Sequence, residues 1–238
     1  MSIKIAVPRE TKEGEKRVAL IPAVVSKLKE MGAEVLVQRG AGEETRIPDE
    51  AYADATLVDD AAGVYKDADI VLKVQPPTVD EIDQMKEGAI VLGFMSAHSR
   101  LDEVQRMRDR GITSFSVELI PRISRAQAMD ALSSQASASG YKAALMAANM
   151  MGRFFPMLTT AAGTIRPATV LVIGAGVAGL QAIATARRLG ARVEGYDVRP
   201  AVKEQVESLG ATFLELEVQA EAEGGYAREL TDEEKQQQ

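Results

Sequence analysis

A glycine-rich turn is the part of the sequence whose residue types and spacing point most directly to chemistry. It has the pattern GxGxxG and lies within VLVIGAGVAGLQAIATARRLGARVEGYDVR. The first glycine permits a tight turn, the second lets backbone approach a pyrophosphate, and the third allows a helix to pack closely on a strand. Unpaired N–H groups at the start of that helix attract the anion. The spacing alone also fits a purely structural turn, but its strand-to-helix context predicts dinucleotide binding. The turn comprises Gly174, Ala175, Gly176, Val177, Ala178 and Gly179.

An acidic residue follows the next predicted strand, where a dinucleotide turn needs one. Asp197 comes 18 positions after Gly179 (197 − 179), near the roughly 20 that is typical. A carboxylate there binds the ribose hydroxyls and repels the 2′-phosphate of NADP, so we expect NAD(H) as the cofactor. Val198 and Arg199 complete the expected binding segment, and the positive charge of Arg199 acts against this preference.

A second polar constellation follows the alternating run TSFSVEL. The segment PRISRAQAMDALSSQ, residues 121–135, holds more hydrogen-bonding side chains than a surface loop requires. A dehydrogenase that reduces a carbonyl also needs a proton donor. The one histidine, His98, is interpreted as a solvated loop residue, while Lys73 and Arg17 are either surface charges or ligand contacts.

Elements that could position these residues recur along the chain as a helix, a glycine and a short strand. This alternation predicts parallel sheets with helices on both faces. Further strands are expected in the stretches IKIAV, DIVLKV and AIVLGFM, and a second domain restarts at ATVLVIGAG. The repeated pattern occurs at residues 24–42, 104–119, 184–200 and 204–217.

The predicted fold class is α/β, with two doubly wound, Rossmann-like domains. The first domain covers residues 1–133, and 134–167 contain a linking segment with a hairpin at 156–167. A long helix is expected over 133–155. The NAD-binding domain, 168–238, has strands enough for one mononucleotide half only, so the chain is expected to be a fragment or to be completed by another chain.

Composition excludes several function classes. The 238 residues are 46% hydrophobic and contain no cysteine, so disulfides and zinc–thiolate sites are excluded. The net charge of −7 argues against nucleic acid as a partner. Neither a signal peptide nor a run of about 20 apolar residues is evident, so we expect a chain that is not embedded in the membrane.

Five stretches carry a resemblance to a known family: PRETKEGEKRVALIPAVVSKL, VLKVQPP, PRISRAQAMDALSSQ, TAAGTIRPATVLVIGAGVAGLQAIATARRLGA and DVRPAVKEQVESLGATF. They look like the NAD(H)-binding component, domain I, of proton-translocating NAD(P) transhydrogenase. The resemblance implies two domains with a cleft between them and a homodimer in which a hairpin clasps the partner. It also implies two partners, an NADP(H)-binding domain and a membrane proton-channel domain. The component is then cytoplasmic, peripheral on the inner face of the membrane.

The same resemblance assigns roles to the polar segment. Arg122, Gln127, Asp130 and Ser133 match family residues that border the nicotinamide and form the catalytic set, and Tyr226 matches a mobile loop that closes over the nucleotide. Hydride transfer between two nicotinamide rings needs no separate proton at the carbon centres, so positioning dominates. A transhydrogenase component is therefore expected to lack a general acid, in agreement with the absence of an evident one in this sequence.

Two alternatives remain. Alanine dehydrogenase is similar in architecture, and Arg17 and Lys73 match its contacts to the substrate carboxylate. Its catalytic histidine, however, falls near Ser96 rather than His98. The other alternative is a non-catalytic subunit that senses NAD, which would share the binding features and exchange no hydride.

Overall fold

The computed structural model describes residues 2–215 and Thr231. Residues up to Asp130 form one compact unit, and those from Ala131 onward form a second. Each unit is an α/β arrangement with its own parallel sheet, as predicted.

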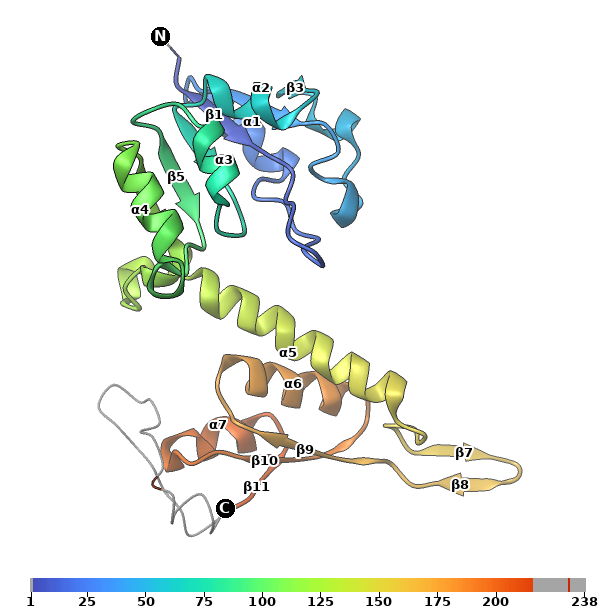
Figure 1. Cartoon of the computed structure of the whole chain (residues 1–238). Helices are drawn as coiled ribbons and strands as arrows, with labels where there is room; N and C mark the ends of the chain where they lie inside the picture. The colour runs from blue at the N-terminus through green and yellow to red at the C-terminus, as the bar shows by residue number, and fades with distance from the viewer. Residues whose placement is uncertain (1, 216–230, 232–238) are drawn as a thin grey trace. The chain divides into compact units, whose positions relative to one another are not determined.

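The first unit is built on a six-stranded sheet in which every pair of neighbours is parallel. The strand order β3-β2-β1-β4-β5-β6 is that of a doubly wound sheet, and the order reverses between β1 and β4. Figure 1 labels β1, β3 and β5 of this sheet together with the helices of the unit. The strands are β1 (Lys4–Val7), β2 (Glu34–Gln38), β3 (Thr56–Val58), β4 (Ile70–Leu72), β5 (Ile90–Gly93) and β6 (Thr113–Ser116).

Alternate residues of the central strands enter two separate cores, one on each face of this sheet. Ala6 packs in a cluster with residues of α2, α3 and α4, whereas Val7 packs with α1 and η2. This two-sided burial explains why the strands read as nearly continuous apolar runs. The helices are α1 (Pro22–Glu30), α2 (Ala61–Lys66), α3 (Val79–Gln84) and α4 (Leu101–Asp109), with 3₁₀ turns η1 (Glu43–Thr45), η2 (Asp49–Tyr52), η3 (Ala97–Ser99), η4 (Val117–Leu119) and η5 (Ser124–Met129).

In the described residues of the second unit, three strands form a parallel sheet in the order β11-β10-β9. Ile183 and Val206, both fully buried, lie together in the core on one face of this sheet. These strands correspond to one half of a doubly wound sheet. The elements are α5 (Ala131–Met150), β9 (Thr169–Ile173), α6 (Val177–Arg188), β10 (Arg192–Tyr196), η6 (Pro200–Val202), α7 (Lys203–Ser208) and β11 (Thr212–Phe213).

The long helix and the hairpin belong to the second unit. The helix expected over 133–155 runs instead from Ala131 to Met150. Gly152 lowers helix propensity, and Pro156 disfavours helical backbone at the residue before it, which explains the earlier end. The predicted hairpin is present as β7 (Leu158–Thr160) paired with β8 (Gly163–Ile165), and it projects from the unit in Figure 1.

Candidate functional site

The glycine turn lies where β9 passes into α6. Gly174 has a φ of +90°, a conformation that favours glycine, and its N–H donates to the Tyr196 carbonyl at 2.7 Å. A Cβ added to Gly179 would lie only 1.7 Å from the Gly174 carbonyl oxygen. The tight turn expected at Gly174 and the close approach expected at Gly179 are therefore present, while nucleotide binding by this turn stays a prediction. Gly176 is the N-cap of α6, and both Gly176 and Val177 are exposed, so a ligand can reach this backbone.

Asp197 directly follows β10, so its carboxylate reaches the same turn. Its Oδ2 accepts the Ala175 N–H at 2.7 Å, and Oδ1 accepts the Arg199 backbone N–H at 2.9 Å. The Arg199 side chain adds Nε to Oδ1 and Nη2 to Oδ2, each at 2.8 Å. Burial alone raises the pKa of Asp197, but these hydrogen bonds outweigh it and hold that pKa below its ordinary value. The carboxylate is thus ionised and contacts the glycine turn, with the Arg199 side chain bound to both of its oxygens. Val198 between them is half-buried.

The long helix α5 supports the turn from behind. A Cβ added to Gly140 would lie 2.0 Å from the carbonyl oxygen of Ala178, in the first turn of α6. Ser137 Oγ also reaches Gln181 Oε1 at 3.4 Å. Nothing in the sequence around Gly140 indicates this contact, because its partner lies 38 positions away (178 − 140).

The polar segment matched to the nicotinamide forms η5 and the start of α5. Arg122 and Gln127 are exposed, and the Asp130 N–H donates to the Gln127 carbonyl at 3.1 Å. Asp130 and Ser133 are half-buried, and Ser133 lies in α5. Their roles at the nicotinamide stay predictions. Tyr226 lies outside the described residues.

Lys73 is buried, so the surface interpretation of this residue is wrong. Its Nζ lies 2.7 Å from Glu81 Oε1 and 3.5 Å from Glu10 Oε2. The Tyr65 hydroxyl donates to the same Glu81 oxygen at 3.0 Å, and burial raises the pKa of Tyr65 above its ordinary value. Glu10 Oε1 also accepts the Val74 N–H at 2.6 Å. This ionic cluster joins the ends of β1 and β4 to α3, a link that sequence reasoning missed.

Arg17 is exposed and also bound to a carboxylate of the chain. Its Nε and Nη2 reach Glu15 at 2.8 and 2.6 Å. These bonds are the main cause of a Glu15 pKa of about 2, against an ordinary value near 4.5. Gln75 adds a further hydrogen bond to Glu15 at 2.6 Å. The cations proposed as ligand contacts are therefore already paired with acidic groups of the chain.

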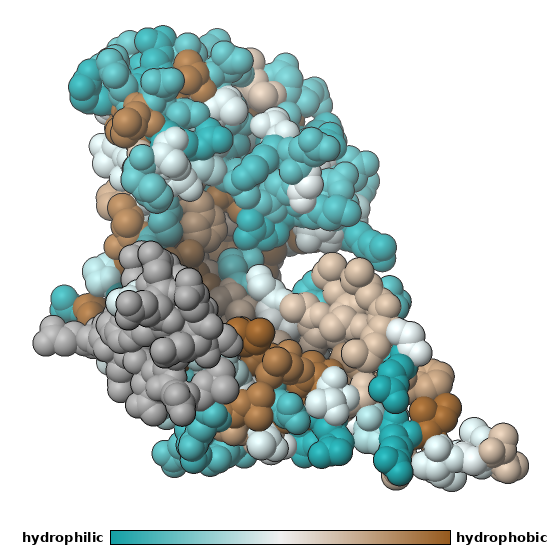
Figure 2. All heavy atoms as spheres, turned by 60° about the horizontal axis from the view of Figure 1, so that its bottom comes forward, coloured by the Kyte–Doolittle hydropathy of each residue, from teal (hydrophilic) through white to brown (hydrophobic). Residues whose placement is uncertain are grey.

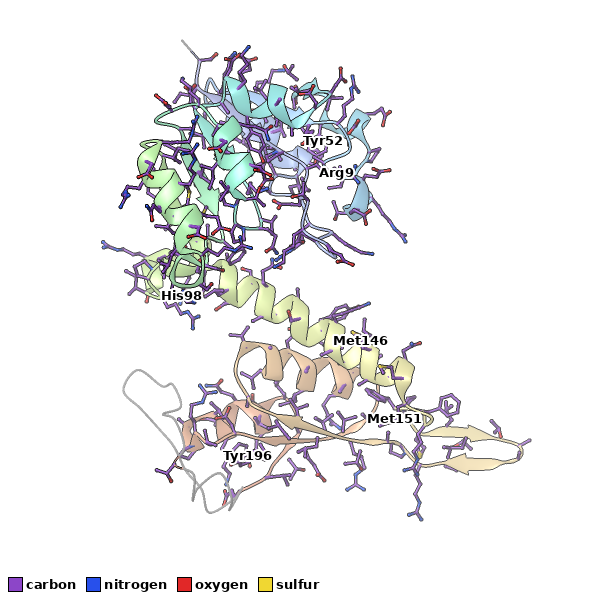
Figure 3. All side chains as sticks on the ribbon, in the orientation of Figure 1. Arg9, Tyr52, His98, Met146, Met151 and Tyr196 are labelled. Atoms are coloured by element: carbon purple, nitrogen blue, oxygen red, sulfur yellow. The ribbon has the colours of Figure 1, made fainter. Side chains whose placement is uncertain are left out.

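The loop after β5 holds the histidine and the residue matched to a catalytic histidine. His98 is exposed on η3, as expected (Figure 3). Ser96 has a φ of +48°, and its N–H donates to Glu118 Oε1 at 2.6 Å. Glu118 accepts the Met95 N–H as well, so one carboxylate fixes the backbone of this loop.

Comparisons with known proteins agree with this architecture. Profiles described as alanine dehydrogenase/PNT, N-terminal and C-terminal domain, match residues 6–139 and 143–236. An NAD(P) transhydrogenase alpha subunit of Rhodospirillum rubrum is 49% identical, covering 97% of this chain and 63% of the relative. A crystal structure of transhydrogenase from Sinorhizobium meliloti matches with a TM-score of 0.86 and 48% identity, over 89% of this chain and 64% of that one. An alanine dehydrogenase of Mycobacterium tuberculosis is 34% identical over 82% of this chain and 54% of its own length.

The chain thus spans less than two thirds of the length of these relatives. Among the helices that the structure describes, none combines the length and apolar character needed to cross a membrane. The matched domain models and the names of the transhydrogenase relatives indicate NAD(P) binding, while its assignment to the glycine turn stays a prediction. On its sequence and its fold, the chain belongs to the alanine dehydrogenase/PNT family and is more similar to the NAD(P) transhydrogenase alpha subunits than to the alanine dehydrogenases compared with it.

Proposed function

We propose that this chain is the NAD(H)-binding component of a proton-translocating transhydrogenase. In this role it passes hydride between NADH and NADP⁺ held on a partner domain, and a membrane domain couples the transfer to proton movement. The component itself is peripheral on the inner face of the membrane, through those partners. The subunit names of the relatives at 44–49% identity support the assignment.

One observation carries the binding part of the proposal. The glycine turn, the start of α6 and the Asp197 carboxylate lie together at the carboxyl ends of β9 and β10. Backbone N–H groups there suit a pyrophosphate, and the carboxylate suits a ribose diol. Asp197 is ionised, so it disfavours the 2′-phosphate of NADP and supports NAD(H) as the bound form.

The polar segment is proposed to orient the nicotinamide. A hydride moves with its electron pair from one ring to the other, and no proton has to be delivered at the carbon centres. Side chains such as Gln127, Asp130 and Arg122 then serve by fixing the ring position, which lowers the barrier without tightening the ground state. Ser133 completes this set.

Alanine dehydrogenase activity fits the geometry less well. Such an enzyme needs cations open to the substrate carboxylate and a proton donor near the hydride acceptor. Lys73 is enclosed by Glu81 and Glu10, and Arg17 is paired with Glu15. Each cation already has carboxylate partners, and the catalytic histidine of that family falls near Ser96 rather than at His98.

The test follows transfer between NADH and an NADP analogue by stopped flow, with the full-length protein and the family's NADP(H)-binding domain. Gln127→Asn should slow transfer more than threefold, above 0.7 kcal/mol by rate arithmetic, while NADH affinity stays within twofold. Gln205→Asn, an exposed glutamine of α7, is the matched control. If Gln127→Asn transfers hydride at the wild-type rate, the role of the segment is structural and the proposed orienting role is wrong. NADH binding without any transfer favours the sensing subunit, and alanine-dependent NAD reduction favours the dehydrogenase.

We also propose a homodimer, because the second unit exposes apolar side chains. Methionines and other apolar side chains remain exposed along the end of α5 and into the hairpin. Figure 3 labels two of them, Met146 and Met151, and Figure 2 shows hydrophobic residues gathered on this unit. A groove of about 550 Å³ at the base of the hairpin is lined by Met151, Phe154 and Phe155 among others. A two-stranded hairpin alone is marginal in water and gains stability on a neighbour.

Light scattering on the full-length protein tests the dimer. Deleting Thr159 to Thr164 removes most of the hairpin and should give monomers. Met150→Ser, at a residue that is 79% exposed, should weaken the dimer, whereas Met31→Ser, at a residue of the first unit that is 82% exposed, should leave it unchanged. A dimer that survives the deletion would contradict the proposal.

A further inference from the structure

The acceptor capacity of Asp197 is already used within the chain. A carboxylate offers about four lone-pair positions. Four donors reach it here: the Ala175 N–H, the Arg199 N–H, and Nε and Nη2 of the Arg199 side chain, at 2.7 to 2.9 Å. The Asp197 and Arg199 side chains are only 6% and 16% exposed. A ribose diol can donate to this carboxylate only after a donor has left.

The Arg199 guanidinium also lies beside the second glycine of the turn. A Cβ on Gly176 would lie 4.0 Å from Arg199 Nη2, which is the nearest atom outside the local chain. This is the side on which a pyrophosphate approaches the turn. Arg199 therefore sits between the two groups that have to bind the ribose and the pyrophosphate.

The Ala175 and Arg199 backbone donors belong to the turn and the loop themselves. Of the four donors, only Nε and Nη2 of the Arg199 side chain can move away without a change in backbone conformation. Its departure breaks two charge-assisted hydrogen bonds, which are stronger than neutral ones. A ligand that carries phosphate provides a new anionic partner for the guanidinium, whereas an uncharged nucleoside provides none.

We propose that the Arg199 side chain is an internal occupant of the ribose position and that it must leave Asp197 before a dinucleotide binds. This inference rests on the proposed NAD(H) site and adds a specificity element to it. The displaced guanidinium remains beside the turn and pairs with the pyrophosphate. Ligands with a phosphate next to the ribose are therefore selected over ligands that offer the ribose alone.

Adenosine and ADP distinguish the release of Asp197 by Arg199 from the pairing of Arg199 with phosphate, because only ADP carries a phosphate. Binding of each to the full-length protein is measured by calorimetry or NMR titration for wild type, Arg199→Ala and Arg199→Lys. Arg199→Ala removes the competitor, so adenosine should bind at least tenfold tighter, a change of about 1.4 kcal/mol. The affinity for ADP should change by less than threefold, because the variant also loses the cation that pairs with the phosphate. Arg199→Lys keeps the positive charge but cannot make the bidentate contact. It should therefore increase the affinity for adenosine by less than Arg199→Ala does.

Arg192→Ala provides the matched control. Arg192 is exposed at the opposite end of β10 from Asp197, so neither affinity should change. Adenosine binding that is equally weak in wild type and Arg199→Ala, or weaker in the variant, overturns the inference. Thermal unfolding of each variant checks that the second unit remains folded. A wild type that binds neither ADP nor NADH instead overturns the proposed function, so the two failures can be told apart.

Discussion

Replacing Gly140 by alanine should destabilise the second unit, although helix propensity alone predicts the opposite. Alanine in a helix interior is about 1 kcal/mol more favourable than glycine. At this position, however, the new Cβ lies 2.0 Å from the Ala178 carbonyl oxygen, which is 1.4 Å inside the 3.4 Å where ordinary contact begins. The obstacle is backbone, so no side-chain rotation relieves it. Overpacking of this kind costs about 3 kcal/mol, leaving a net loss of about 2 kcal/mol.

The same change should reach the nucleotide turn. Ala178 belongs to the first turn of α6, and separating α5 from it moves the N–H groups that are proposed to bind the pyrophosphate. We expect at least tenfold weaker NADH binding, or about 1.4 kcal/mol. Urea unfolding gives the stability change, and calorimetry gives the NADH affinity.

Ser139→Ala is the control for Gly140→Ala. Ser139 is exposed on the same helix, and its hydroxyl donates to the Gln135 carbonyl at 2.9 Å. The control should be at least as stable as wild type, because alanine has the higher helix propensity. If Gly140→Ala is also as stable as wild type and binds NADH normally, the two helices separate without cost and the packing argument fails.

Three further predictions concern charged groups. Lys73→Met leaves buried carboxylates without their cation and should lower the free energy of unfolding by about 3–5 kcal/mol, while adding Glu81→Gln should recover part of it; a loss below about 1 kcal/mol would contradict the ionic cluster. The Glu15 pKa is depressed to about 2, so its stabilisation is present above pH 4.5 and is lost as pH falls towards 2. Stability measured over that range should fall less steeply in Glu15→Gln, and equal slopes would count against the pairing with Arg17. Asp197→Ser should narrow the preference for NADH over NADPH, as two titrations can show; a wild type that binds NADPH equally well refutes the reasoning.

Local features of the fold were accessible from the sequence because short-range constraints produce them. The strands of the two sheets were expected from short apolar runs, several of which follow a helix and a glycine, and the structure places β1, β4, β5, β9 and β10 within the predicted stretches. The short β3 at Thr56–Val58 was missed, because three residues carry little periodicity. The end of the long helix was placed five residues too late, because alanine and methionine favour helix beyond Met150.

The sequence by itself determined the glycine turn, its following carboxylate and the hairpin, because each depends on residues close in the chain whose backbone conformations are restricted. Only the tertiary structure decided the rest. Lys73 became a buried ion because β4 ends beside Glu10 and α3, and Gly140 became a contact point because α5 crosses α6 at Ala178. Asp197 follows β10 and contacts the turn as the spacing predicts, yet the two hydrogen bonds from the Arg199 side chain depend on side-chain geometry that spacing does not encode. Burial and pairing arise from segments distant in sequence, and so the state of each charge is set by the fold.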